Sequence, residues 1–185
     1  MMMRAVRGAF YRAINPEFRE FALAGSRSAG RYSRPEEPTL YLSSSVEGVN
    51  AAMIAHKDVR STLLEILEVD VKASHILDLR DPAAVEQAGI DMSGASAPWQ
   101  EVASSGGTPA SWMVRDRLLA AGAHGLIDPS RKQPGLWHLV LFRWNVADAP
   151  IVRLVEDASV APLTLADAGC ARGYSLPELD EVPLQ

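Results

Sequence analysis

The chain has 185 residues, a length typical of one domain, and 48% of the residues are hydrophobic while 22% are charged. This is the composition of a globular protein, and it excludes wholesale disorder and a fibrous repeat. No apolar run approaches the ~20 residues that span a bilayer, and no secretory signal is visible, so we expect a cytoplasmic protein with no membrane partner. The single Cys170 excludes an intramolecular disulfide and a multi-thiolate metal site.

Charge is distributed unevenly along the chain. The formal net charge is −5, yet residues 1–34 hold seven arginines and two acidic residues, a balance of +5, and the rest of the chain carries −10. An arginine-rich segment on an acidic body favours a local anion site over a long nucleic-acid surface. The competing interpretation is that these arginines are solvated and form only weak surface ion pairs.

The first half of the chain predicts three strands and one helix. Residues 22–38 are rich in Gly, Pro and Ser and predict a loop, and the Ser45 hydroxyl can cap the helix that follows it. The strands are expected at 9–14, 39–43 and 61–72, the last with a helix as the alternative, and the helix at 46–57.

The second half predicts two helices and three more strands. Asp81-Pro82 starts a short helix, 91–108 form a long irregular stretch, and 109–121 form the clearest helix. Leu118 and Leu119 of that helix are expected in the core, and Arg115 is expected to face outward. The strands lie at 124–127, 137–145 and 151–155.

These elements predict a compact α+β domain of several short strands and about three helices. The domain should cover residues 1–162. Residues 163–185 are rich in Ala, Gly and Pro, so we expect a flexible C-terminal tail there.

The sequence lacks the common nucleotide-binding and catalytic motifs. No Walker loop, Gly-x-Gly-x-x-Gly, His-Glu-x-x-His or nucleophile elbow is present, and the four histidines lack ligand spacing, so we expect no metal. His75 and His138 are expected to be structural.

Arg31 and Tyr32 end the Gly/Ser loop. A forked guanidinium binds phosphate and an exposed tyrosine stacks on a base, although both residues would be unremarkable as structural ones.

Six short segments follow one another in an order that carries more information than any of them alone. The resemblance that they support is to the RES-domain toxins, most closely to the ParT branch of that family, and it covers roughly residues 10–145. The segments are Phe-Tyr-Arg-Ala-Ile at 10–14, Gly-Arg-Tyr at 30–32, Leu-Tyr-Leu-Ser at 40–43, an alanine-rich helix that ends at His56, Gly-Leu-Ile-Asp-Pro-Ser at 125–130, and Leu-Val-Leu-Phe at 139–142.

The resemblance implies a fold similar to that of ADP-ribosyltransferases, with NAD bound in a cleft. Members of the family consume NAD by phosphorolysis, hydrolysis or transfer of ADP-ribose, and a cognate antitoxin holds them inactive. Matched position by position, the family's catalytic residues fall on Arg31, Tyr41, His56 and Ser130. Its NAD-binding residues fall on Arg12, Gly30, Arg31, Tyr32, Tyr41 and Ser43.

One position departs from the family pattern. Ala52 stands where many members carry a glutamate, one turn before His56. A carboxylate there would stabilise the positive charge that develops on the ribose or accept a proton, and alanine does neither. His56 lies on the same helix face and could act as a base, or Asp78, Asp81 or Asp128 could supply a carboxylate. The loss harms transfer to a protein less than hydrolysis or phosphorolysis.

The resemblance therefore predicts a toxin that mono-ADP-ribosylates a protein, with phosphoribosyl pyrophosphate synthetase as the expected target. The alternatives are an NAD glycohydrolase or phosphorylase, a metal-independent ribonuclease, and a non-enzymatic binding protein. The expected partners are the target and an antitoxin whose acidic segment covers Arg12 and Arg31, and no nucleic acid is expected to bind directly.

Overall fold

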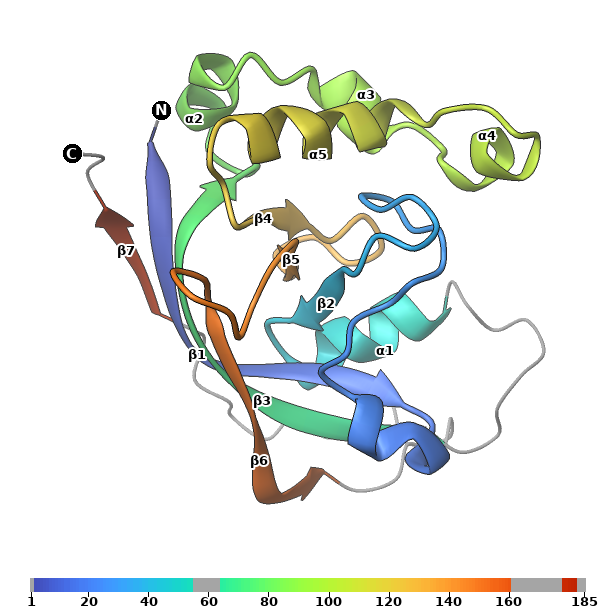
Figure 1. The fold of residues 1–185 in the computed structure, drawn as a ribbon, viewed down its shortest axis with the longest axis vertical. Coiled ribbons are helices and arrows are strands. Elements are labelled where there is room, and N and C mark those ends of the chain that lie inside the picture. Colours follow the sequence, from blue (N-terminus) through green and yellow to red (C-terminus); the bar gives the residue numbers. More distant parts are fainter. Residues whose placement is uncertain (1, 55–63, 161–177, 183–185) are drawn as a thin grey trace.

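The computed structural model describes residues 2–54, 64–160 and 178–182, which form one α+β unit (Figure 1). The predicted fold class is confirmed. The strands are β1 (Met3–Ile14), β2 (Leu40–Ser43), β3 (Glu65–Asp78), β4 (Gly125–Pro129), β5 (Trp137–Leu141), β6 (Ile151–Val160) and β7 (Glu178–Val182). The helices are the 3₁₀ helix η1 (Pro16–Phe21) and the α-helices α1 (Val46–Ile54), α2 (Pro82–Gln87), α3 (Met92–Ser96), α4 (Gln100–Ser104) and α5 (Ala110–Ala120).

All seven strands belong to one sheet, in the order β6-β3-β4-β5-β2-β1-β7. Since β1 also pairs with β3, the strands β1, β2, β5, β4 and β3 close into a small barrel-like ring, and closure removes free edges from these strands. β3 and β4 are parallel, and the other pairs are antiparallel. The long strands β1 and β3 curve through the whole molecule, as Figure 1 shows.

Both long strands extend beyond their predicted bounds. The sequence predicted the first strand only from residue 9, because Gly8 and two arginines interrupt the apolar pattern. Tertiary pairing overrides that local signal: β1 runs beside β3 from Arg4 to Ile14. The helix alternative for 61–72 is wrong over its described part, since β3 is a strand from Glu65 to Asp78.

Successive side chains along each strand point to opposite faces of the sheet, and this alternation separates two apolar clusters. One set of side chains, including Phe10, Leu42 and Leu139, packs inside the ring. The opposite face of β4 and β5 contributes Leu126 and Val140 to a second cluster, which α2, α3 and α5 cover. The ring therefore has an apolar interior and an outer face on which polar residues can gather.

The helices follow their predicted caps. The Ser45 hydroxyl accepts the Gly48 N–H at 3.1 Å at the start of α1, and the Asp81 carboxylate accepts the first free N–H groups of α2. The orientation of α5 differs from the expectation at two residues. Arg115 is buried with 5% of its surface exposed, and Leu119 is 42% exposed.

Two further segments contain more regular structure than the sequence indicated. The stretch 91–108, expected to be irregular, contains α3 and α4. Asp91 caps α3 by accepting the Ser93 N–H. Within the segment expected to be a tail, Glu178–Val182 form β7 against the start of β1. None of the helices in the described part of the chain combines the length and hydropathy that a membrane span requires.

Candidate functional site

The candidate site lies on the outer face of β2, β5 and β4. Ser43 of β2 is paired with His138 of β5, and His138 is paired with Asp128 of β4. Directly paired residues of antiparallel strands point to the same face, so these three side chains form one row across the sheet. Tyr41 lies on the same face, two residues before Ser43.

A tight turn places the Gly-Arg-Tyr segment above this face. The Gly30 N–H donates to the Ser33 carbonyl at 2.9 Å, and the Tyr41 hydroxyl accepts the Tyr32 N–H at 3.2 Å. A Cβ on Gly30 would lie 2.6 Å from the Tyr41 hydroxyl oxygen, so this close approach requires glycine. The structure thus brings together Gly30, Arg31, Tyr32 and Tyr41, which the sequence had assigned to one site.

Two arginines meet beside this turn. Arg31 donates to the carbonyl oxygens of Ala95 and Ala97 at 3.0 and 2.9 Å, and Arg131 donates to the same Ala95 oxygen at 3.1 Å. Burial and the neighbouring Arg131 lower the pKa of Arg31. Guanidinium groups stay protonated in proteins, so two like charges are held together at the end of α3.

Asp128 links the arginine pair to the row of polar side chains. Its carboxylate accepts two hydrogen bonds from Arg131, at 2.7 and 3.0 Å, and one from the Tyr32 hydroxyl at 2.9 Å. Burial and the nearby carboxylate raise the pKa of Tyr32, so the phenol stays neutral. The expectation of an exposed Tyr32 that stacks on a base is wrong, because the side chain is fully buried in the second apolar cluster.

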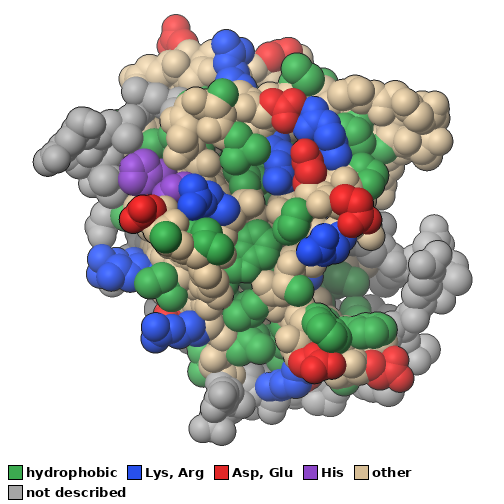
Figure 2. Space-filling view, viewed as in Figure 1, with side chains coloured by type: hydrophobic (Ala, Val, Ile, Leu, Met, Phe, Trp, Pro, Cys, Tyr) green, Lys and Arg blue, Asp and Glu red, His purple; other side chains and the backbone are tan. Residues whose placement is uncertain are grey.

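The charges of this group do not balance. Arg31 and Arg131 contribute two positive charges and Asp128 one negative charge, while the contacts of Arg31 are backbone carbonyls. A phosphate group would neutralise the excess and accept forked hydrogen bonds. The face in Figure 2 shows basic and acidic side chains interspersed, without a continuous basic stripe.

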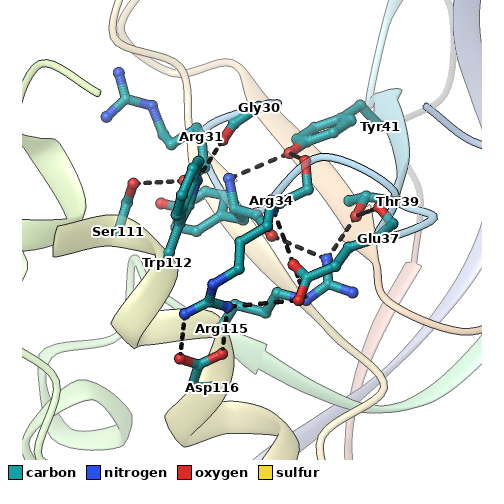
Figure 3. A network of polar contacts seen from close by, with 12 residues as sticks. Gly30, Arg31, Arg34, Glu37, Thr39, Tyr41, Ser111, Trp112, Arg115 and Asp116 are labelled. Atoms are coloured by element: carbon teal, nitrogen blue, oxygen red, sulfur yellow. Dashed lines mark hydrogen bonds and ion pairs between the residues drawn. The ribbon is translucent and has the colours of Figure 1, made fainter. Parts of the chain in front are cut away.

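A second arginine network fastens the same loop to α5 (Figure 3). Arg34 forms two hydrogen bonds with the Asp116 carboxylate, at 2.7 and 2.6 Å, and buried Arg115 donates to the Tyr32 carbonyl at 3.0 Å and to the Thr39 hydroxyl. Glu37 lies 3.5 Å from the guanidinium of both arginines. This network pairs its positive charges with carboxylates.

Two further contacts from α5 hold the backbone of the turn. The Trp112 indole N–H donates to the Gly30 carbonyl at 2.8 Å, and the Ser111 hydroxyl donates to the Arg31 carbonyl. The Arg31 guanidinium itself points away from the other arginines drawn in Figure 3. The backbone of Arg31 is therefore fixed, while its charge is presented on the other side of the loop.

Three assigned residues lie elsewhere or have other contacts. Arg12 of β1 donates to the Ala22 carbonyl at 2.8 Å, at the start of the loop, and burial lowers the pKa of its guanidinium. The Ser130 hydroxyl accepts the Gln133 N–H at 3.2 Å and thereby shapes the turn that carries Arg131. His56 lies outside the described residues.

The carboxylates considered as substitutes for the family glutamate are already engaged. Asp78 accepts two hydrogen bonds from the Arg80 side chain, at 2.8 and 2.7 Å. Asp81 caps α2 and pairs with Arg4 at 3.1 Å, and Asp128 is bound as described above. Among the described residues, no three His, Cys, Asp or Glu side chains gather closely enough to hold a metal ion.

Sequence reasoning missed Arg131 and the position of His138. Arg131 follows Asp128 by three residues at the end of a strand, a spacing that allows an ion pair, but a basic residue in a Gly/Pro-containing turn is usually solvated. His138 was expected to be structural. Its alignment with Ser43 and Asp128 depends on strand register, which a single sequence does not disclose.

Comparisons with known proteins give two findings. The RES domain model matches residues 2–165. A chain in the crystal structure of the M. tuberculosis MbcT–MbcA toxin–antitoxin complex is 21% identical, with 76% of each chain covered and a TM-score of 0.52. At that identity the likeness shows a shared fold. A comparison with the curated proteins found no match.

Proposed function

The chain belongs to the RES domain family, and from this premise we propose that it is an NAD-consuming toxin whose Arg31–Arg131 pair binds the NAD pyrophosphate. The observation that carries the proposal is the charge excess at this pair. Arg31 has only backbone carbonyl partners in the described part of the chain, and its guanidinium lies beside a second one. The structural neighbour, a chain of a toxin–antitoxin complex, supports the toxin role.

The proposed reaction is mono-ADP-ribosylation of a protein, with phosphoribosyl pyrophosphate synthetase as the candidate target. An acceptor side chain attacks the anomeric carbon of the nicotinamide ribose, and nicotinamide leaves with the electron pair of the glycosidic bond. Ala52 supplies no carboxylate, and Asp78, Asp81 and Asp128 are hydrogen-bonded to other side chains or to a helix end. Weak activation of water favours transfer to an acceptor that brings its own nucleophile.

Labelled NAD distinguishes this reaction from its alternatives. The protein is incubated with adenine-labelled NAD and either purified synthetase or a cell extract. We expect a labelled synthetase band. Arg31→Lys should weaken the label, because lysine keeps the charge but loses the fork, whereas Arg34→Lys, on the same loop, should retain it.

The second candidate function is NAD depletion by hydrolysis or phosphorolysis, and the pyrophosphate site serves it equally well. Free ADP-ribose or ADP-ribose phosphate, formed without labelled protein, would contradict transfer and establish this candidate.

The ribonuclease alternative predicts RNA cleavage without NAD. The face in Figure 2 carries interspersed charges and no basic stripe of the kind that binds RNA.

The proposed function implies an antitoxin, because a free NAD-consuming enzyme harms its own cell. We expect the antitoxin to place an acidic or carboxylate-ended segment against Arg31 and Arg131, where it would mimic the pyrophosphate. Association should be fast and weaken with salt. A complex in which the antitoxin lies far from Arg31 would contradict this mode of inhibition.

A further inference from the structure

The reaction just proposed needs a group that accepts the proton of the attacking nucleophile, and we propose that His138 is this general base. This inference rests on the proposed function and names a residue that sequence reasoning had treated as structural. Three observations carry it: the position of His138 between Ser43 of β2 and Asp128 of β4, its contacts, and the engagement of the other candidate bases among the described residues.

The position follows from the sheet register. His138 is directly paired with Ser43 on one side and with Asp128 on the other, so its imidazole lies in the row that joins β2 to the arginine pair. Asp128 is held by Arg131, whose guanidinium meets Arg31 at the Ala95 carbonyl. When the NAD pyrophosphate lies on Arg31 and Arg131, the nicotinamide ribose can therefore lie near Ser43, His138 and Asp128.

Within the part of the chain that the structure describes, the contacts of His138 leave one ring nitrogen for chemistry. Its Nδ1 lies 3.0 Å from the Ser43 hydroxyl oxygen, a hydrogen bond that orients the half-buried ring. Burial lowers the pKa of His138, Arg131 adds to that effect, and Asp128 opposes it. The net lowering keeps the imidazole neutral at pH 7, the state in which a histidine accepts a proton.

The other described groups on this face are poor bases. The carboxylate oxygens of Asp128 accept three hydrogen bonds, from Arg131 and Tyr32. The phenols of Tyr32 and Tyr41 have raised pKa values because of burial, so both are neutral and act as donors or acceptors without titrating. Among the described histidines, the rings of His75 and His124 contact each other at an angle of 53°, with centroids 5.0 Å apart, and do not belong to this row.

The proposed step balances. The acceptor O–H or N–H attacks the anomeric carbon, the glycosidic C–N bond breaks, and its electron pair neutralises the pyridinium ring to release nicotinamide. The proton passes to Nε2 of His138, which becomes an imidazolium beside the Asp128 carboxylate. Nδ1 meanwhile retains its hydrogen bond to Ser43, so the ring stays oriented as it gains charge.

His138→Asn tests the proposal, since asparagine preserves a hydrogen bond to Ser43 but does not titrate. In the presence of the acceptor protein, we expect nicotinamide release from NAD to slow by about 100-fold while the Kd for ADP-ribose stays within twofold. Because burial lowers the pKa of His138, the wild-type rate should decline only at a pH below the ordinary range of histidine, and the variant should lack this decline. His124→Asn is the matched control and should behave like wild type.

The outcomes separate the two proposals. An active wild type with a His138→Asn variant that is within threefold of its rate, or that keeps its pH dependence, overturns the base and leaves the NAD function intact. A wild type that releases no nicotinamide overturns both. If His138→Asn binds ADP-ribose poorly, His138→Ala with added imidazole decides: recovery of the rate supports a base, and no recovery overturns it.

Discussion

Two arginine networks each include one arginine of the same loop, and they differ in how their charge is balanced. Arg34 and Arg115 are paired with Asp116 and Glu37 and connect the loop to α5. Arg31, three residues before Arg34, donates to backbone carbonyls and lies beside Arg131. Ion pairs that connect two elements stabilise the fold, whereas adjacent like charges favour the binding of an anion.

The difference shows that arginines on one loop can have two roles, one in stabilising the fold and one in binding a ligand. The balanced network keeps the Gly30–Ser33 turn in place through the Tyr32 carbonyl and the Trp112 indole. The unbalanced pair depends on that turn for its position. Substitutions in the first network should therefore change stability, and substitutions in the second should change binding with little loss of stability.

The largest effect is expected at Arg115. Replacement by alanine removes the hydrogen bonds to Tyr32 and Thr39 and leaves Glu37 without one of its partners. We expect the free energy of unfolding to fall by about 3 kcal/mol, measured by urea denaturation. Arg117→Ala, on the exposed side of the same helix, should change it by less than about 0.5 kcal/mol. Equal stabilities of the two variants would show that the balanced network is not architectural.

A smaller effect is expected at the turn itself. Gly30→Ala places a methyl group 2.6 Å from the Tyr41 hydroxyl oxygen and 2.8 Å from that of Ser33. Stability should fall by about 1–2 kcal/mol. Because Tyr41→Phe removes one of the clashing atoms, the double variant should lose less than the two single variants together. Additive losses in this double-mutant cycle would place the turn away from Tyr41.

The smallest effect concerns pH. Burial lowers the pKa of both His124 and His138 below the unfolded value, so the unfolded chain binds protons more readily. The stability that this difference contributes is present above about pH 6.5 and is lost as the pH falls toward the folded pKa values. Between pH 7.5 and 5.5, wild type should therefore lose more stability than the variant with both histidines changed to asparagine. The difference should be about 0.5 kcal/mol, since solvent screens the part-exposed His124. No difference between the two pH profiles would contradict the burial effect.

Local patterns predicted most strands and the caps of α1 and α2, because alternation and capping residues are short-range signals. The grouping of Gly30, Arg31, Tyr32 and Tyr41 came from the resemblance to the RES-domain toxins. The full length of β1 and β3 did not follow from the sequence, because it arises from pairing between residues 51 to 72 positions apart, from Ile14–Glu65 to Arg4–Ile76.

The missed features of the site share a physical cause. Arg115 sits on a helix face that composition marks as exposed, and only the loop packed against α5 buries it. Tyr32 occupies a loop, and its burial depends on the same packing. The position of His138 beside Asp128 depends on strand register, and the position of Arg131 depends on a carbonyl at the end of α3. Both are long-range properties of the fold.

The most direct test of the central claim is the affinity for ADP-ribose, measured by calorimetry on wild type, Arg31→Lys and Arg34→Lys. ADP-ribose carries the pyrophosphate and has no nicotinamide to lose, so binding is measured without turnover. Loss of a forked contact should weaken Arg31→Lys by about tenfold, and Arg34→Lys should stay within twofold of wild type. Equal affinities of wild type and Arg31→Lys would contradict a pyrophosphate site at the Arg31–Arg131 pair.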